Sequence, residues 1–146
     1  MFVLEDLLYS EGHLWVKPED NELATIGLSD YAQEIFGEIT SIDLPAEQEE
    51  IVKDDEFAYI ETLTSGYDLY APISGTVIEV NQSVLKNPDL ITDDPYEDGW
   101  LIKVKMTQPA EIEELLRPGE YEEIVEEERL KAEVDMEEEE LEDFEE

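Results

Sequence analysis

The residues best suited to carry chemistry lie at the tip of a predicted hairpin between residues 57 and 72. Residues 57–60 are apolar and β-prone, and residues 69–71 resume an extended pattern before a proline. The turn between them contains Gly66, a residue able to take a positive φ without steric cost. The tip and its flanks are Glu61, Thr62, Leu63, Thr64, Ser65, Gly66, Tyr67 and Asp68. Loop tips held by rigid strands often carry function, so this tip is the first candidate site.

The tip offers hydroxyls and two flanking carboxylates, but no arrangement typical of catalysis. Acidic residues are so common in this chain that a carboxylate pair for acid–base chemistry does not stand out. The sequence contains no phosphate-binding loop, catalytic triad or cluster with metal-ligand spacing. It contains no cysteine, which excludes disulfides, thiolate metal sites and cysteine nucleophiles. We therefore predict no catalytic residue, no metal site and no enzymatic activity of its own.

His13 and Tyr67 each have a functional and a structural interpretation, and the two tryptophans have a structural one. His13 is the only histidine, and it is either a base or ligand in a cleft or a structural residue at the start of a strand. Tyr67 either anchors a partner or packs within the hairpin. Trp15 and Trp100 are expected in the core.

The charge of the chain is extreme, with 43 acidic residues against 8 basic ones. Such a polyanion repels phosphates and anionic lipid surfaces, so we expect no nucleic-acid or membrane partner. Residues 120–146 alone hold 16 acidic and 2 basic residues, a net charge of −14. The acidic surface either keeps the chain solvated, as in a high-salt cell, or steers a basic protein partner to it.

The length of 146 residues suits one domain with extensions. We predict an N-terminal lead over 1–12, a body over 13–122 and an acidic tail over 123–146. The tail is expected to be disordered or a marginal helix, because like charges crowd it. No apolar run is long enough to span a membrane, and the lead lacks the basic residues of a secretory signal. A cytoplasmic location is therefore expected.

Short strands separated by glycine and proline turns dominate the body. The patterns predict strands at 13–17, 23–28, 38–44, 51–52, 57–60, 69–71, 77–80 and 100–106. Short helices are predicted at 29–36 and 110–116, with Pro118 and Gly119 ending the second. A loop with a helical turn near Ser83 is expected between the last two strands. This order favours a mostly-β sandwich or flattened barrel.

Several motifs in this order resemble the glycine cleavage system H-protein family, whose members are lipoyl-domain carriers. The matching runs are Gly12-His13-Leu14-Trp15-Val16, Ile26-Gly27-Leu28-Ser29-Asp30-Tyr31-Ala32-Gln33, Gly37-Glu38-Ile39, Asp43-Leu44-Pro45, Asp68-Leu69-Tyr70-Ala71-Pro72-Ile73-Ser74-Gly75, Val77-Ile78-Glu79-Val80-Asn81, Pro88-Asp89-Leu90-Ile91, Asp94-Pro95-Tyr96 and Gly99-Trp100-Leu101-Ile102-Lys103. Together they cover about residues 10–122. The resemblance implies a lipoyl/biotinyl-type flattened β-barrel with short helices, a C-terminal helix and a hairpin tip that displays a prosthetic group.

The tip departs from the pattern of the family that the chain resembles. The family reads roughly Glu-Ser-Val-Lys-Ala, with lipoate on the lysine, where this chain has Glu61-Thr62-Leu63-Thr64-Ser65. Thr64 therefore stands at the lysine position, and its hydroxyl cannot form the amide that lipoylation needs. The nearest lysines, Lys53 and Lys86, lie 11 and 22 residues away and outside the hairpin. We predict no bound cofactor, and lipoate only if another lysine is modified.

A second departure follows the only histidine. Leu14 replaces a glutamate that the family places near the cleft that receives the loaded arm, so the resemblance makes His13 and Leu14 cleft candidates. In the family, acidic groups beside the tip help to position the lysine for the modifying enzyme. Glu61 and Asp68 are the matching residues, and they are either functional or inherited surface.

These observations leave three hypotheses. The first is a non-catalytic binding or regulatory relative of H proteins that engages glycine decarboxylase-type or lipoate-handling enzymes without an arm. The alternative is a genuine lipoate or aminomethyl carrier of the glycine cleavage system that is modified at another lysine. The third is an assembly factor whose acidic tail docks a basic protein.

Overall fold

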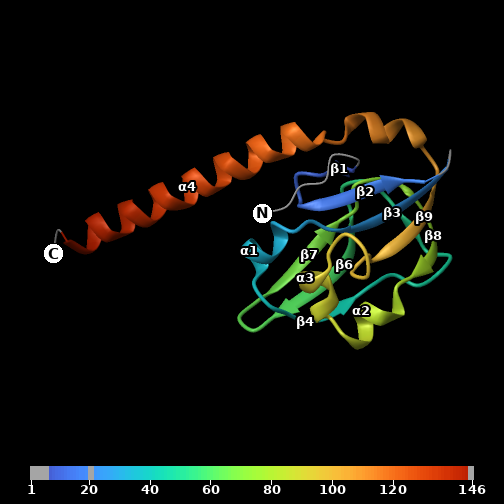
Figure 1. Cartoon of the computed structure of the whole chain (residues 1–146), viewed down its shortest axis with the longest axis horizontal. Coiled ribbons are helices and arrows are strands. Elements are labelled where there is room, and N and C mark those ends of the chain that lie inside the picture. The colour runs from blue at the N-terminus through green and yellow to red at the C-terminus, as the bar shows by residue number, and fades with distance from the viewer. Residues whose placement is uncertain (1–6, 20–21, 145–146) are drawn as a thin grey trace.

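The computed structural model describes residues 7–19 and 22–144 of the chain (Figure 1). Residues 1–6 of the predicted lead lie outside the described residues. Leu8–Tyr9 forms the short strand β1, which pairs with β2 (Leu14–Pro18) in antiparallel register. The described part of the lead therefore joins the larger sheet as a short strand.

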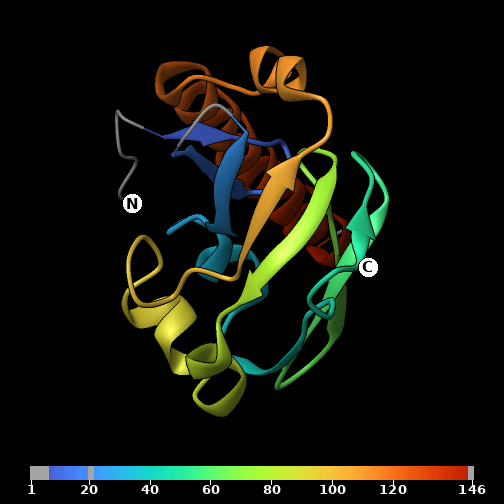
Figure 2. The same cartoon turned by 90° about the vertical axis from the view of Figure 1, so that its right-hand side faces the viewer.

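Two antiparallel sheets form a sandwich, which confirms the predicted mostly-β fold with few short helices and a C-terminal helix. The six-stranded sheet has the spatial order β1, β2, β3 (Leu23–Leu28), β9 (Ile102–Met106), β8 (Gly75–Val80) and β5 (Glu50–Ile51). The three-stranded sheet has the order β4 (Ile39–Asp43), β6 (Glu56–Thr62) and β7 (Gly66–Tyr70). Figure 2 shows β8 and β9 side by side in the larger sheet.

The alternation along β2 supplies two separate cores. Leu14 and Val16 are fully buried between the two sheets, together with Ile26 of β3 and Ile60 of β6. We call this larger buried cluster the main core. Trp15 points to the other face of β2, because successive strand residues alternate sides. It belongs to a second buried cluster, which comprises Leu7, Tyr9, Trp15, Tyr31, Tyr121 and Val125. The prediction of a core position holds for Trp15, whereas Trp100 is only partly buried and lies under the Lys103 ammonium, 5.4 Å from its ring centre.

The short helices lie in the connections. They are α1 (Ala32–Phe36), α2 (Gln82–Lys86), α3 (Asp89–Asp93) and the 3₁₀ helix η1 (Pro109–Glu114). Asn81 caps α2 by accepting a hydrogen bond from the Ser83 amide at 3.1 Å, which confirms the predicted helical turn near Ser83. The rest of the expected loop is wrong in part, because α3 forms within it. The helix predicted over 110–116 is the shorter 3₁₀ turn of η1.

A single long helix, α4 (Pro118–Phe144), occupies the region expected to be a disordered or marginally helical tail. Pro118 begins this helix, where the sequence suggested that it ended one, because a proline has no amide hydrogen to lose in a first turn. The helix runs without a break across the predicted boundary at residue 122. Its first turns lie beside β1, and its C-terminal part projects beyond the sandwich (Figure 1). In the part of the chain that the structure describes, no helix is long and apolar enough to cross a membrane.

Candidate functional site

The predicted tip is the apex of the hairpin formed by β6 and β7, which projects from one end of the sandwich (Figure 1). The register pairs Ile60 with Tyr67 and Glu61 with Gly66, so the apex spans residues 63–65. Ile60 and Leu69 are buried in the main core and fix one face of the hairpin. The core therefore holds both strands, while the apex extends into solvent.

The Thr62 side chain organises the apex turn. Its hydroxyl donates to the Ser65 carbonyl at 3.0 Å and accepts from the Ser65 amide at 3.1 Å. The Thr62 amide donates to the same carbonyl at 2.8 Å. From the neighbouring strand β4, the Thr40 hydroxyl donates to the Glu61 carbonyl at 3.1 Å. The Thr64 amide also donates to the Thr62 hydroxyl, at 3.4 Å, so side-chain and backbone bonds together hold the turn over residues 62–65.

The apex side chains are exposed. Thr64, Ser65 and Glu61 all face solvent, and Leu63 is 75% exposed. Asp68 is exposed on the same face of the hairpin as Tyr59, with which it pairs across the strands. The structure therefore places hydroxyls, one apolar side chain and flanking carboxylates together at this end of the molecule.

Gly66 is needed for space and not for a positive φ. A Cβ atom added at this position would lie 1.7 Å from the hydroxyl oxygen of Tyr59, whose ring covers the glycine. Among the described glycines, a positive φ occurs at Gly37, so the conformational role predicted for Gly66 is wrong. The cross-strand aromatic ring instead stiffens the base of the apex.

Tyr67 packs within the molecule. Its ring lies 4.7 Å from the ring of Phe36, which ends α1, and it is partly buried against the main core. Of the two interpretations, the structure favours packing. Tyr67 joins the hairpin to α1 and so orients the apex relative to the sandwich.

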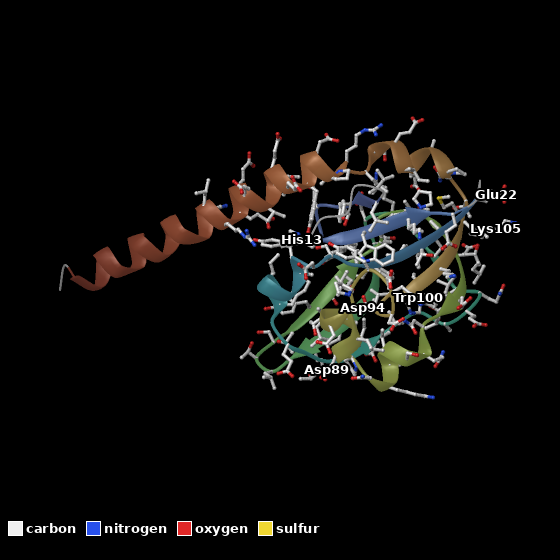
Figure 3. All side chains as sticks on the ribbon, in the orientation of Figure 1. His13, Glu22, Asp89, Asp94, Trp100 and Lys105 are labelled. Atoms are coloured by element: carbon white, nitrogen blue, oxygen red, sulfur yellow. The ribbon has the colours of Figure 1, made fainter. Side chains whose placement is uncertain are left out.

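His13 lies in a buried network under α4 (Figure 3). Its Nδ1 lies 3.0 Å from the Tyr121 hydroxyl, which in turn lies 2.6 Å from the Ser29 hydroxyl. Its Nε2 lies 3.1 Å from a carboxylate oxygen of Glu128. Burial lowers the pKa of His13, against the opposing effect of Glu128. A neutral ring satisfies every contact, with Nε2–H donating to Glu128 and Nδ1 accepting from Tyr121.

Of the two interpretations of His13, the structure favours a structural residue at the start of a strand. Leu14 is fully buried in the main core, because the inward face of β2 accepts an apolar side chain at this position. His13 is 7% exposed and adopts a positive φ of 68°, at the turn that leads into β2. Neither residue is brought to the hairpin apex. Both hold the sandwich together.

Residues of α4 that the sequence reasoning assigned no role complete this network. Tyr121 stacks on Tyr9 with ring centres 4.5 Å apart, and Val125 is fully buried beside it. Burial also raises the pKa of the Tyr121 hydroxyl, so it remains protonated. Arg129 lies over the ring of Tyr31 at 5.1 Å. The spacing of Tyr121 and Val125, one helical turn apart within an acidic run, is the signal that could have found this anchored face.

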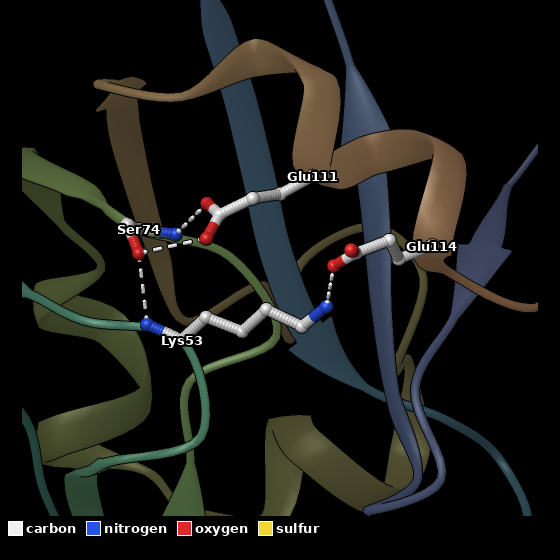
Figure 4. A network of polar contacts seen from close by, with 4 residues as sticks. All are labelled: Lys53, Ser74, Glu111 and Glu114. Atoms are coloured by element: carbon white, nitrogen blue, oxygen red, sulfur yellow. Dashed lines mark hydrogen bonds and ion pairs between the residues drawn. The ribbon is translucent and has the colours of Figure 1, made fainter.

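A polar network, which we call the closing network, lies at the end of the sandwich opposite the apex (Figure 4). Its members are Lys53, Ser74, Glu111 and Glu114. The Lys53 ammonium pairs with Glu114, and the Lys53 amide donates to the Ser74 hydroxyl at 2.9 Å. The Ser74 amide and hydroxyl donate to the Glu111 carboxylate at 2.7 and 3.0 Å. The hydrogen bond with Glu114 is the main cause that raises the pKa of Lys53. This network lies beside Ala71, beyond the end of β7 that is remote from the apex.

The apex does not fit an amide-linked prosthetic group. Such a group needs an amine, and residues 56–70 contain neither lysine nor arginine. Lys53 and Lys86, the nearest lysines in sequence, are held in the closing network and at the end of α2, respectively. Within the described residues, no group of three or more histidine, cysteine, aspartate or glutamate side chains is arranged to hold a metal ion.

Two antiparallel sheets, a projecting hairpin and a C-terminal helix define a small β-sandwich of the lipoyl-domain type. The family model for the glycine cleavage H-protein matches residues 7–128. The glycine cleavage system H protein of Carboxydothermus hydrogenoformans is 45% identical over 126 residues, covering 86% of this chain and 96% of the relative. The chain belongs to the glycine cleavage H-protein family.

Further relatives agree with this assignment. The mitochondrial glycine cleavage system H protein 3 of Arabidopsis thaliana is 45% identical over 126 residues, covering 86% of this chain and 75% of the relative. The crystal structure of a glycine cleavage system H protein from Mycobacterium marinum has a TM-score of 0.75 and 30% identity, and covers 82% of this chain and 95% of that chain. The matched region includes the first turns of α4, which lie within residues 7–128.

Proposed function

We propose that this protein is a non-lipoylated member of the H-protein family that binds the enzymes recognising H proteins, without delivering a lipoyl arm. The observation that carries this proposal is the hairpin apex. Thr64 stands at the position where the family's tip has its lysine, and no side chain of the hairpin supplies an amine. A protein with this body and this apex can occupy a docking site but cannot transfer a group by a swinging arm.

The fold that this chain shares with H proteins supports a binding role. Both sheets, the hairpin and the C-terminal helix are present, and identity to curated H proteins reaches 45% over 126 residues. We expect the partner to be a glycine decarboxylase-type enzyme, or an enzyme that attaches or transfers lipoate. Occupying such an enzyme would make the protein a competitor or regulator of the loaded carrier.

The alternative is a carrier modified at another lysine. The chain has six lysines, and the one nearest to the apex in sequence, Lys53, belongs to the closing network at the other end of the barrel. Its ammonium pairs with Glu114, which holds this side chain away from the apex. Intact-mass measurement and peptide mapping of all six lysines in native protein test this alternative. A lipoyl-sized increment would establish it and overturn the argument from Thr64.

A third role uses the acidic helix to attract a basic partner. Residues 120–146 have a net charge of −14, and α4 projects beyond the sandwich. Truncation for this test should begin after Lys131, because Tyr121, Val125 and Glu128 hold the first turns to the body. Binding that is unaffected by this truncation and by added salt would contradict the role.

The direct experiment is a competition for glycine decarboxylase from the same host. We expect the purified protein to bind this enzyme and to displace its lipoylated H protein, while its own mass equals that of the bare chain. The lipoylated H protein is the positive control. Failure of this protein to bind any enzyme that the control binds would overturn the proposed function.

A further inference from the structure

The apex presents an apolar side chain that the fold does not use. Leu63 is 75% exposed, more than any other large apolar side chain in the described part of the chain. Leu130 and Val52 follow at 61% and 53%. An exposed leucine adds little to the buried apolar area of the monomer, so the Leu63 side chain at the hairpin apex is available to a partner.

The turn beneath Leu63 is organised before any partner arrives. The Thr62 hydroxyl makes bonds of 3.0 and 3.1 Å to the carbonyl and amide of Ser65, which bracket the apex. The Thr40 hydroxyl ties the adjacent strand to the hairpin at the Glu61 carbonyl. A side chain presented on an ordered turn loses little conformational freedom when it is buried by a partner.

The surroundings of the apex define the charge of that partner. Glu61 and Asp68 flank the apex, and Glu38 precedes Ile39, which pairs with Thr62 beside it. The segments 29–44 and 56–70, which meet at this end of the sandwich, contain no lysine or arginine. An apolar side chain flanked by carboxylates complements an apolar pocket with a basic rim.

We infer that Leu63 is the anchor of the docking surface: it enters a narrow apolar pocket of the partner enzyme while Glu38, Glu61 and Asp68 face basic residues at the pocket's rim. This inference rests on the proposed function and names the contact by which binding occurs. Leu63 takes the central, desolvated position in the interface, and the carboxylates govern the rate of encounter and its dependence on salt.

The test measures the affinity of glycine decarboxylase for Leu63 variants of the full chain. Leu63→Ala should weaken binding roughly 10- to 100-fold, the effect expected for losing one buried leucine side chain. Leu63→Met keeps the apolar volume and should bind within about threefold of the wild type. The matched control is Leu85→Ala, at a 39% exposed leucine on α2, which should bind as the wild type does.

The outcomes separate this inference from the proposed function. If the wild type binds and Leu63→Ala binds equally well, the anchor is refuted and the proposed function stands. If the wild type does not bind at all, both fall. Leu63 is outside the core, so the thermal midpoint of Leu63→Ala should match that of the wild type, and a lowered affinity then reports the interface. Binding that does not weaken with ionic strength would refute the basic rim.

Discussion

The buried hydroxyl of Tyr121 offers the sharpest test of how α4 is attached. Tyr121→Phe removes one oxygen and keeps the ring, which stacks on Tyr9 at 4.5 Å. The lost oxygen lies 2.6 Å from the Ser29 hydroxyl and 3.0 Å from His13 Nδ1. Ser29 is 2% exposed and His13 is 7% exposed, so neither regains water when its partner is lost.

The expected loss of stability follows from the two groups that lose their partner, the Ser29 hydroxyl and His13 Nδ1. Each buried polar group left without its partner costs about 1–3 kcal/mol, so the variant should lose about 2–6 kcal/mol of unfolding free energy. For a chain of this size, the thermal midpoint should fall by about 4–24 °C. Urea denaturation followed by circular dichroism measures the first quantity, and calorimetry measures the second.

The control is a tyrosine whose side chain is exposed instead of buried. Tyr70→Phe removes a hydroxyl from a 50% exposed tyrosine on β7 and should change stability by less than about 0.5 kcal/mol. An equally small change in Tyr121→Phe would refute the reasoning. It would mean that the stacked ring and Val125 alone hold α4, and that the polar chain to Ser29 and His13 adds nothing to stability.

Three further predictions concern other parts of the molecule. Burial lowers the pKa of His13, so the unfolded chain binds that proton more readily; stability is complete above about pH 6.5 and falls as the pH drops below it. His13→Asn, which tolerates the positive φ, should flatten this slope in denaturation curves, and an unchanged slope would exclude His13 as its source. Gly27→Ala should lose about 1–3 kcal/mol in urea denaturation, because its Cβ would lie 2.5 Å from the buried Trp15 ring, and near-neutral behaviour would contradict that packing. Thr64→Lys should gain a lipoyl-sized mass with a lipoate ligase, whereas Ser65→Lys, one position along, should not; modification of both or neither would show that position 64 is not the specific site.

The local chemistry of the hairpin explains why it could be predicted from the sequence. Apolar β-prone runs predict its strands, and adjacent small and hydroxyl residues predict its turn. All of these signals lie within the 16 residues from 57 to 72. The capped turn at Asn81 and Ser83 rests on the same kind of short-range signal. The fold class was predicted correctly, because many such local elements leave few ways to bury their apolar faces.

The misplaced residues depend on contacts that no local pattern contains. The sequence left His13 as either a cleft residue or a structural one, because one partner of its ring, Tyr121, lies 108 positions away. The acidic composition of the tail indicated disorder or a marginal helix, whereas a helical face with Tyr121 and Val125 packs on the second core and begins a continuous helix. Packing of a few buried side chains therefore outweighs the repulsion along the exposed faces of these first turns.

The sequence is enough to establish the chemistry of the apex: hydroxyls, an apolar leucine and carboxylates, with no side-chain amine anywhere in the hairpin. Side-chain identity decides which covalent groups a tip can carry, and no fold alters it. Tertiary structure alone decided which residues are accessible. It buried Leu14 and His13, packed Tyr67 against Phe36, and left Leu63 exposed at the hairpin apex. Burial is a property of segments distant in sequence meeting in space, and it appears only when the sheets and α4 close over their cores.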